Sequence, residues 1–245
     1  MVLTPMADDT TKEYSGDELA SLAVMPNYNG WIFSHFRAHL GGRAVEFGAG
    51  LGTVSAALAP AVDSLELVEP SPRFARVLKD RFAAQPNVSV VASTFEAAVA
   101  HMPDRSRDVA VMVNVLEHIE DDIAALRELF RILAPGGRLL LFVPALPSLY
   151  SEFDRRVGHF RRYRLKPLCE AVSASGYDIV RAGYFDSIGV LSWWLINKVA
   201  GVATINPRLA RLYDRVFVPP LRILEGLVPP PVGKNVVLVA RKASD

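Results

Sequence analysis

Apolar and polar positions along this chain follow two patterns, which alternate from about residue 43 onward. Short runs rich in Val, Ile, Leu and Phe are typical of buried strands. They lie at 43–47, 64–69, 88–92, 108–115, 138–143, 177–184 and 235–242. Stretches with helical character lie between or before them, at 28–40, 51–60, 71–85, 121–133 and 167–175. The pattern predicts strands that alternate with helices.

The stretch 121–133 shows the helical rhythm most clearly. Its apolar residues fall at positions 123, 126, 129, 130 and 133, which form one stripe along a helix. Asp121 and Asp122 stand at its start, where negative charge suits the helix dipole, and Pro135-Gly136-Gly137 ends it. We predict a helix with defined ends here.

Strands and helices in this order form parallel strand pairs through right-handed crossovers, with helices on both faces. The predicted fold is therefore an α/β, doubly wound sheet in one domain, residues 16–245, after a flexible tail at 1–15. Residues 154–166 are expected to form a basic loop, and the apolar residues 186–227 a helical insertion.

Composition narrows the class of protein. A length of 245 residues with 51% hydrophobic residues suits one globular domain with a large core. The formal net charge of +1 gives no reason to expect a nucleic-acid partner. Cys169 is the single cysteine, which excludes an internal disulfide. The first residues are polar and acidic, without the pattern of a signal peptide, so we expect a cytoplasmic protein.

The first strand runs into a loop with three glycines, in the sequence VEFGAGLGTVS at 45–55. In an open parallel sheet, ligands bind beyond the carboxyl ends of the strands, and this loop lies at that edge. Glycine lets the backbone turn tightly and approach a ligand, and the next helix offers free N–H groups. The loop predicts a nucleotide-binding site, but several classes of protein share such a loop.

Three features narrow the ligand. Position 53 is threonine, so the dinucleotide fingerprint is incomplete. Glu46, close to the loop, would repel a pyrophosphate and attract an ammonium group. Glu69, at the end of the second strand, can accept hydrogen bonds from ribose hydroxyls. S-adenosylmethionine has a ribose, a cationic amino-acid head and no phosphate, so it satisfies all three conditions.

Four segments resemble the class I S-adenosylmethionine-dependent methyltransferases, in particular the branch that acts on small molecules. They are EFGAGLG (46–52), LVEP (67–70), NVLEHIEDD (114–122) and LAPGGRLLLFVP (133–144). In order and spacing they cover roughly residues 43–145. The resemblance implies a Rossmann-like sheet of seven strands whose last strand, at 235–242, is antiparallel. It also implies an enzyme that methylates a small-molecule acceptor.

The resemblance further implies where the cofactor lies: methionine at the glycine loop and beside Asn114, ribose on Glu69, and adenine near 93–95. The helix at 28–40 would cover it. The cofactor-binding set is Tyr28, Glu46, Gly48, Ala49, Gly50, Gly52, Glu69, Pro70, Ser93, Thr94, Phe95, Asn114 and Val115. Purely structural roles compete at several positions, since Glu46 can pair with a neighbour and Ser93 or Thr94 can cap the next helix.

The sequence FDRRVGHFRRYRLKP at 153–167 is a candidate for the acceptor pocket, because it leaves the sheet at the same edge as the glycine loop. Its GH-F-RRY core resembles a pattern in a subgroup of bacterial small-molecule methyltransferases. Arginine can clamp a carboxylate or phosphate through two parallel hydrogen bonds. The predicted acceptor-binding residues are Trp31, His159, Arg161, Arg162 and Tyr163. The alternative is a solvated basic loop.

His118 and His159 are the candidates for a general base, which is needed only if the acceptor is a protonated hydroxyl or amine. His35 and His39 lie four residues apart, but no third ligand accompanies them and we expect no metal site.

Two other functions stay open: an NAD-dependent oxidoreductase, and a non-catalytic protein that binds S-adenosylmethionine. The insertion at 186–227 has three readings: a lid over an apolar part of the acceptor, ordinary core packing, or shallow membrane association.

Overall fold

The structure is a computed structural model that describes residues 23–199 and 206–243. The tail expected at 1–15 lies outside this range. Seven strands form one sheet in the order β3-β2-β1-β4-β5-β7-β6, and β7 pairs antiparallel with both of its neighbours. The strands are β1 (Arg43–Phe47), β2 (Ser64–Glu69), β3 (Val88–Ala92), β4 (Arg107–Val113), β5 (Leu133–Pro144), β6 (Tyr177–Phe185) and β7 (Asn235–Lys242). The doubly wound fold with an antiparallel last strand is confirmed.

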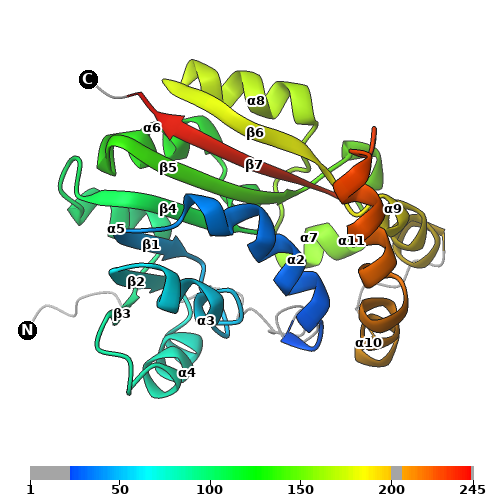
Figure 1. Cartoon of the computed structure of the whole chain (residues 1–245), viewed down its shortest axis with the longest axis horizontal. Helices are drawn as coiled ribbons and strands as arrows, with labels where there is room; N and C mark the ends of the chain where they lie inside the picture. Colours follow the sequence, from blue (N-terminus) through cyan, green and yellow to red (C-terminus); the bar gives the residue numbers. More distant parts are fainter. Residues whose placement is uncertain (1–22, 200–205, 244–245) are drawn as a thin grey trace, which may run out of the picture.

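Helices cover both faces of the sheet (Figure 1). Those that contribute to the core on one face are α5 (Phe95–His101), α6 (Asp122–Ile132) and α8 (Leu165–Ala174). The other face carries α2 (Pro26–Phe36), α3 (Ser55–Leu58), α4 (Pro72–Arg81), α10 (Pro207–Val216) and α11 (Val218–Leu227). The short helices α7 (Glu152–Val157) and α9 (Ser187–Trp193) follow β5 and β6 along the chain.

The strands divide their side chains between the two faces with a period of two, as a pleated strand must. In β1, Val45 and Phe47 belong to the core under α5 and α6, whereas Ala44 belongs to the opposite core. The same alternation places Glu46 on the face of Ala44. The consequence for the candidate site is that Glu46 turns toward α3 and away from the side of Phe47.

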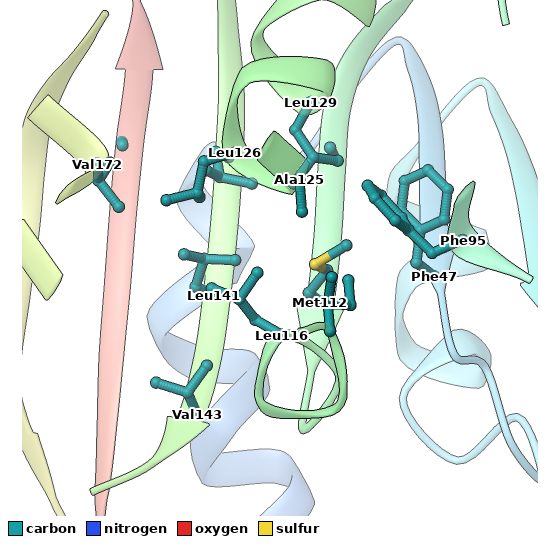
Figure 2. Close-up of a cluster of buried hydrophobic side chains, with 14 of the residues drawn as sticks. Phe47, Phe95, Met112, Leu116, Ala125, Leu126, Leu129, Leu141, Val143 and Val172 are labelled. Carbon is teal, nitrogen blue, oxygen red and sulfur yellow. The ribbon is translucent and has the colours of Figure 1, made fainter. Parts of the chain in front are cut away.

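The helix α6 confirms the stripe expected at 121–133. Ala125, Leu126 and Leu129 pack over Met112 and Leu141 of the central strands (Figure 2). The Asp121 side chain caps the helix by accepting a hydrogen bond from the Ala124 N–H at 2.9 Å. The apolar stripe and the N-terminal cap both indicate the same helix, and for this reason the sequence alone predicts α6.

Three local expectations were wrong. The basic stretch 154–166 is not all loop, because α7 occupies its first residues. Ser151 and Asp154 form a capping box that starts α7, and Gly158, at a φ of 84°, ends it. The helix α5 had no counterpart among the expected elements, and β5 begins five residues before the expected run at 138.

The insertion at 186–227 is helical where it is described, as expected. It comprises α9, a π-helical turn at Trp194–Val199, α10 and α11, while residues 200–205 lie outside the described range. Figure 1 shows α9, α10 and α11 gathered at the end of the sheet from which β7 starts. A search of the described residues finds no helix with the length and apolar character required to cross a membrane.

Candidate functional site

The glycine loop after β1 adopts a conformation that favours glycine at each of its three positions. Gly48, Gly50 and Gly52 have φ angles of 69°, 55° and 74°. The N–H of Gly48 donates to the Val68 carbonyl at 2.8 Å, which ties the loop to β2. A Cβ at Gly48 would lie 2.4 Å from Cγ2 of Val115, so a side chain there would collide with the wall of the site. Gly48 therefore keeps the space in front of the loop open.

Glu69 is the carboxylate that joins this loop to the end of β2. Its Oε2 accepts a hydrogen bond from the Gly50 N–H at 2.8 Å, and its Oε1 accepts one from the Ser71 N–H at 2.9 Å. Burial raises the pKa of Glu69, and the two backbone N–H groups oppose that rise. Each carboxylate oxygen can accept a second bond, so Glu69 is fixed in place and still able to bind hydroxyl groups.

In front of the loop lies a cavity of about 310 Å³, which we call the first cavity. It includes nine residues of the predicted set, among them the candidate base His118. Phe95 supplies an aromatic ring that is itself held edge-on by Phe47 at a centroid distance of 4.9 Å. The lining residues are Phe47, Gly48, Gly50, Val68, Glu69, Pro70, Ser71, Thr94, Phe95, Glu96, Asn114, Val115, His118 and Ile119.

The groups that line the first cavity suit S-adenosylmethionine. Loop glycines leave room for a backbone approach, Glu69 offers carboxylate oxygens to ribose, and Phe95 offers an apolar surface to a base. Thr94 caps α5, since its hydroxyl accepts a hydrogen bond from the Ala97 N–H at 3.3 Å, and it also lines the cavity. Its contact with adenine stays a prediction.

Glu46 does not line the first cavity. It is 2% exposed and accepts a hydrogen bond of 2.5 Å from the Ser55 hydroxyl of α3. Burial raises the pKa of Glu46 to about 8, against the lowering effect of Ser55, and the nearby charge of Glu69 adds to the rise. Glu46 thus lies behind the loop, where its carboxyl holds the loop to α3.

Ala49, Gly52 and Ser93 adjoin the first cavity in sequence but are not among its lining residues. A Cβ at Gly52 would lie 2.8 Å from side-chain atoms of both Leu78 and Phe82. Gly52 is therefore a packing position between the loop and α4.

A second cavity, of about 60 Å³, lies next to the first. Asn114 lines both, at the point where β4 ends. Its φ is 53°, an unusual value for a residue other than glycine, and its N–H donates to the Phe142 carbonyl at 2.8 Å. The second cavity is lined by Tyr28, Asn114, Phe142, Pro144, Phe153, His159, Arg162, Trp193, Lys234 and Asn235.

Asp154 organises the polar wall of the second cavity. Its Oδ1 lies 2.8 Å from Nδ1 of His159 and accepts a hydrogen bond of 2.7 Å from Nε of Arg162. Its Oδ2 accepts from the Ser151 N–H at 2.8 Å. Burial by itself raises the pKa of Asp154, but the contacts with His159 and Arg162 prevail and lower it to about 2. The carboxyl is therefore ionised at neutral pH.

The two candidate bases meet at the boundary between the cavities. Their ring centroids are 4.6 Å apart, with His118 on the first cavity and His159 on the second. Burial, followed by the charge of His159, lowers the pKa of His118 to about 4, so His118 is neutral at pH 7. Glu117 lies beside these two histidines. One carboxylate oxygen of Glu117 and one ring nitrogen each of His118 and His159 lie within 4.8 Å of one another.

Three residues expected in the acceptor pocket line neither cavity. Arg161 forms an ion pair with Asp122 at 2.8 Å. The Tyr163 hydroxyl is buried and donates toward Leu116 and Asp122, at 3.2 and 3.0 Å. Trp31 packs against Phe185 in the core. Arg162, which lies between Arg161 and Tyr163 in sequence, lines the second cavity.

Tyr28, expected at the cofactor, lines the second cavity, and its hydroxyl lies 3.0 Å from Oδ1 of Asn235.

Several lining residues had no signal in the sequence. Trp193, Lys234 and Asn235 come from the insertion and from the start of β7, far along the chain from the glycine loop. The Nζ of Lys234 lies 3.3 Å from Asp186, and the ring of Trp193 lies under the Arg162 guanidinium at 4.7 Å. The one available signal was the capping-box spacing of Ser151 and Asp154, which marks Asp154 as an ordered carboxylate.

A family model described as a methyltransferase domain matches residues 32–182. The demethylmenaquinone methyltransferase of Beutenbergia cavernae is 27% identical over 184 residues, 74% of each chain. The ubiquinone biosynthesis O-methyltransferase of Azotobacter vinelandii is 30% identical over 173 residues, 63% of this chain and 73% of that protein.

Among solved structures, a phosphoethanolamine N-methyltransferase of Haemonchus contortus, in complex with phosphomonomethylethanolamine and S-adenosylhomocysteine, has a similar fold. Its TM-score is 0.60 at 16% identity, and the match covers 89% of this chain and 53% of that chain.

Proposed function

This chain belongs to the class I S-adenosylmethionine-dependent methyltransferases, and we propose that it methylates an oxygen or nitrogen atom of a small, partly apolar acceptor. The observation that carries this proposal is the position of Asn114, which lines both cavities. A cofactor in the first cavity and an acceptor in the second would meet at this residue. Such juxtaposition is the main requirement of methyl transfer.

The first cavity is the proposed cofactor site. Glu69 would hold the ribose hydroxyls, Phe95 would contact adenine, and Gly48 and Gly50 would admit the methionine part. Glu46 could act on the ammonium group only from behind the loop, since Ser55 holds its carboxyl on that side.

The second cavity is the proposed acceptor site, and its chemistry suggests the acceptor's two parts. Phe142, Phe153 and Trp193 provide apolar surface, while Arg162 and Lys234 provide cationic donors. These donors suit an oxygen-bearing or anionic head group beside an apolar part. The two curated relatives are named for menaquinone and ubiquinone chemistry, and quinones combine these features.

The chain's own residues would align the reactants and remove a proton. Bound S-adenosylmethionine supplies a methyl group on a positively charged sulfur, which leaves as a neutral thioether when the acceptor's lone pair bonds to the methyl carbon. Asn114 and Val115 would orient the two reactants at the end of β4. A hydroxyl or amine acceptor also loses a proton, and we assign its removal to His159, supported by the Asp154 carboxylate. His118, neutral at pH 7, lies beside His159 and can relay that proton.

The proposal is tested by methyl transfer from labelled S-adenosylmethionine to a panel of hydroquinones and phenols, with and without an alkyl chain and with and without a carboxylate. Transfer to alkylated members of the panel would support it. Lack of transfer to every oxygen and nitrogen probe, with S-adenosylhomocysteine still bound, would contradict the acceptor class.

Neighbouring arginines offer a matched pair of variants. Arg162→Lys keeps the charge but removes the fork, and we expect the KM of the best probe to rise about tenfold, with unchanged affinity for S-adenosylhomocysteine. Arg161→Lys should change neither value by more than about twofold, because Arg161 pairs with Asp122 outside the cavity. Equal effects of the two variants on KM would show that Arg162 is not part of the acceptor site.

A further inference from the structure

The helices α9 to α11 and the residues after them expose an unusual amount of apolar surface. Of the 18 large hydrophobic residues that are exposed in the described part of the chain, 14 lie between residues 188 and 232. We call these residues the apolar face. They are Ile188, Leu191, Trp194, Leu195, Ile196, Leu209, Leu212, Val216, Phe217, Ile223, Leu224, Leu227, Val228 and Val232. An exposed patch of this kind marks an interaction surface.

The orientation of α10 shows that its apolar residues face outward although polar ones are buried. This helix turns Ala210 and Asp214 inward, where Asp214 accepts hydrogen bonds from the backbone N–H groups of Asn27 and Tyr28 at 3.2 and 2.8 Å. Leu209, Leu212 and Val216, in contrast, are each more than half exposed. The helix thus buries a carboxylate and presents leucines to the outside, the reverse of a surface helix in a globular domain.

The charges around the apolar face have one sign. Arg208, Arg211, Arg215 and Arg222 are all exposed on α10 and α11. The three carboxylates of residues 186–232 bind inside the fold instead.

Asp186 caps α9 through the Gly189 N–H, Asp214 binds the start of α2, and Glu225 accepts from the N–H and hydroxyl of Ser187 at 2.8 and 2.7 Å. The described surface of these helices is therefore apolar and basic, on a chain whose net charge is only +1.

We propose that this face binds the surface of an anionic lipid bilayer, with the leucines of α9 to α11 in the interface and the arginines at the phosphate groups. Amphipathic helices with arginine beside a broad apolar face bind membranes in this way. A second copy of this chain is the weaker alternative, because two copies of the same basic face would repel each other.

One of these helices, α9, contributes to the wall of the second cavity. Trp193, at the end of α9, lines the second cavity and contacts Phe153 edge-on at a centroid distance of 5.0 Å. A bilayer against the apolar face would therefore bring apolar molecules close to the cavity. This consequence rests on the proposed function, whereas membrane binding itself can be measured without turnover.

The test uses the full chain and sedimentation with vesicles of phosphatidylcholine, with or without about a third of phosphatidylglycerol. We expect binding to the anionic vesicles that weakens with salt, and little binding to the neutral ones. Arg211→Glu/Arg215→Glu should weaken binding about tenfold or more. Leu209→Gln/Leu212→Gln should weaken it as well, and both pairs are exposed, so folding should be unaffected.

The matched control is Arg76→Glu/Lys79→Glu on the exposed side of α4, which changes the net charge equally and should leave vesicle binding within about twofold. Affinity for S-adenosylhomocysteine and turnover of a water-soluble probe should be the same in all variants. Absence of binding to anionic vesicles overturns the proposal. So does equal weakening by both charge pairs, or a dimer that dissociates in the leucine variant, which would identify the face as an interface between copies.

Discussion

Asp154 and His159 are joined by a buried contact of 2.8 Å between Oδ1 and Nδ1. Because an ionised carboxylate can only accept, this contact requires the proton of the neutral imidazole to sit on Nδ1. The lone pair is then on Nε2. Asp154 also holds Arg162, so one carboxylate positions two of the polar side chains of the second cavity.

Replacing Asp154 with asparagine should lower turnover by about a hundredfold or more, because an amide can donate to Nδ1 and favour the wrong tautomer. The pH profile of kcat should change in shape, because the general base would then carry its proton on the wrong nitrogen, while affinity for S-adenosylhomocysteine stays within about threefold. Asp178→Asn, at an exposed carboxylate on β6, is the control. A slower enzyme with an unchanged pH profile would mean that Asp154 has only a structural role.

Glu69→Gln should weaken the binding of S-adenosylhomocysteine about tenfold or more, since hydrogen bonds to a charged group exceed those to a neutral one. Calorimetry measures this directly. Glu66→Gln, on the same strand and paired with Arg107, serves as the control and should leave affinity unchanged. Equal affinities of the wild type and Glu69→Gln, in a folded variant, would exclude the ribose role.

The contribution of Glu46 to the stability of the cofactor-free protein should fall as pH rises from about 5 to about 8. The folded state raises the pKa of Glu46 to about 8, so in this window it retains a proton that the unfolded chain has lost. Each pKa unit corresponds to about 1.4 kcal/mol.

The Tm of Glu46→Gln minus the Tm of the wild type, measured by calorimetry, should therefore increase between pH 5.5 and 8.5. A difference in Tm that does not change with pH would show that Glu46 is ionised throughout. The same variant tests the ammonium role: unchanged affinity for S-adenosylhomocysteine would leave Glu46 a purely structural residue behind the loop.

Gly48→Ala should weaken cofactor binding about tenfold or more and lower Tm. The new methyl group would lie 2.4 Å from Val115, on a backbone with a φ of 69° that costs a non-glycine residue about 1 kcal/mol or more. Gly183→Ala is a matched control, because a Cβ there meets nothing within 4 Å. If both alanine variants bind S-adenosylhomocysteine like the wild type, the loop does not contact the cofactor.

Local signals predicted the sheet and most of the first cavity, because both depend on residues close in sequence. The glycine loop, Glu69 and Phe95 each follow a strand, and parallel strands bring such positions to one edge. Glu46 shows the limit of this reasoning. Proximity to the loop suggested a ligand contact, but the pleat of β1 turns its carboxyl to the other face.

The second cavity depends on contacts between distant parts of the chain, which no local pattern specifies. Trp193 reaches it from the insertion, and Lys234 reaches it from the residue just before β7. Arg161 and Arg162 were equivalent in the sequence, yet α7 and its capping box set the path of the chain so that only Arg162 faces Asp154. A short helix that goes unrecognised thus changes which of two neighbouring side chains reaches the site.

Asn114, whose backbone lies in the left-handed region, can couple the affinities for the two ligands. Its side of β4 is common to both cavities, so a shift of Asn114 on occupation of one cavity also changes the shape of the other. Any such coupling is reciprocal: the factor by which the cofactor changes the affinity for the acceptor equals the factor by which the acceptor changes the affinity for the cofactor. The coupling can then be measured from either side, as the change that one bound ligand makes in the affinity for the other.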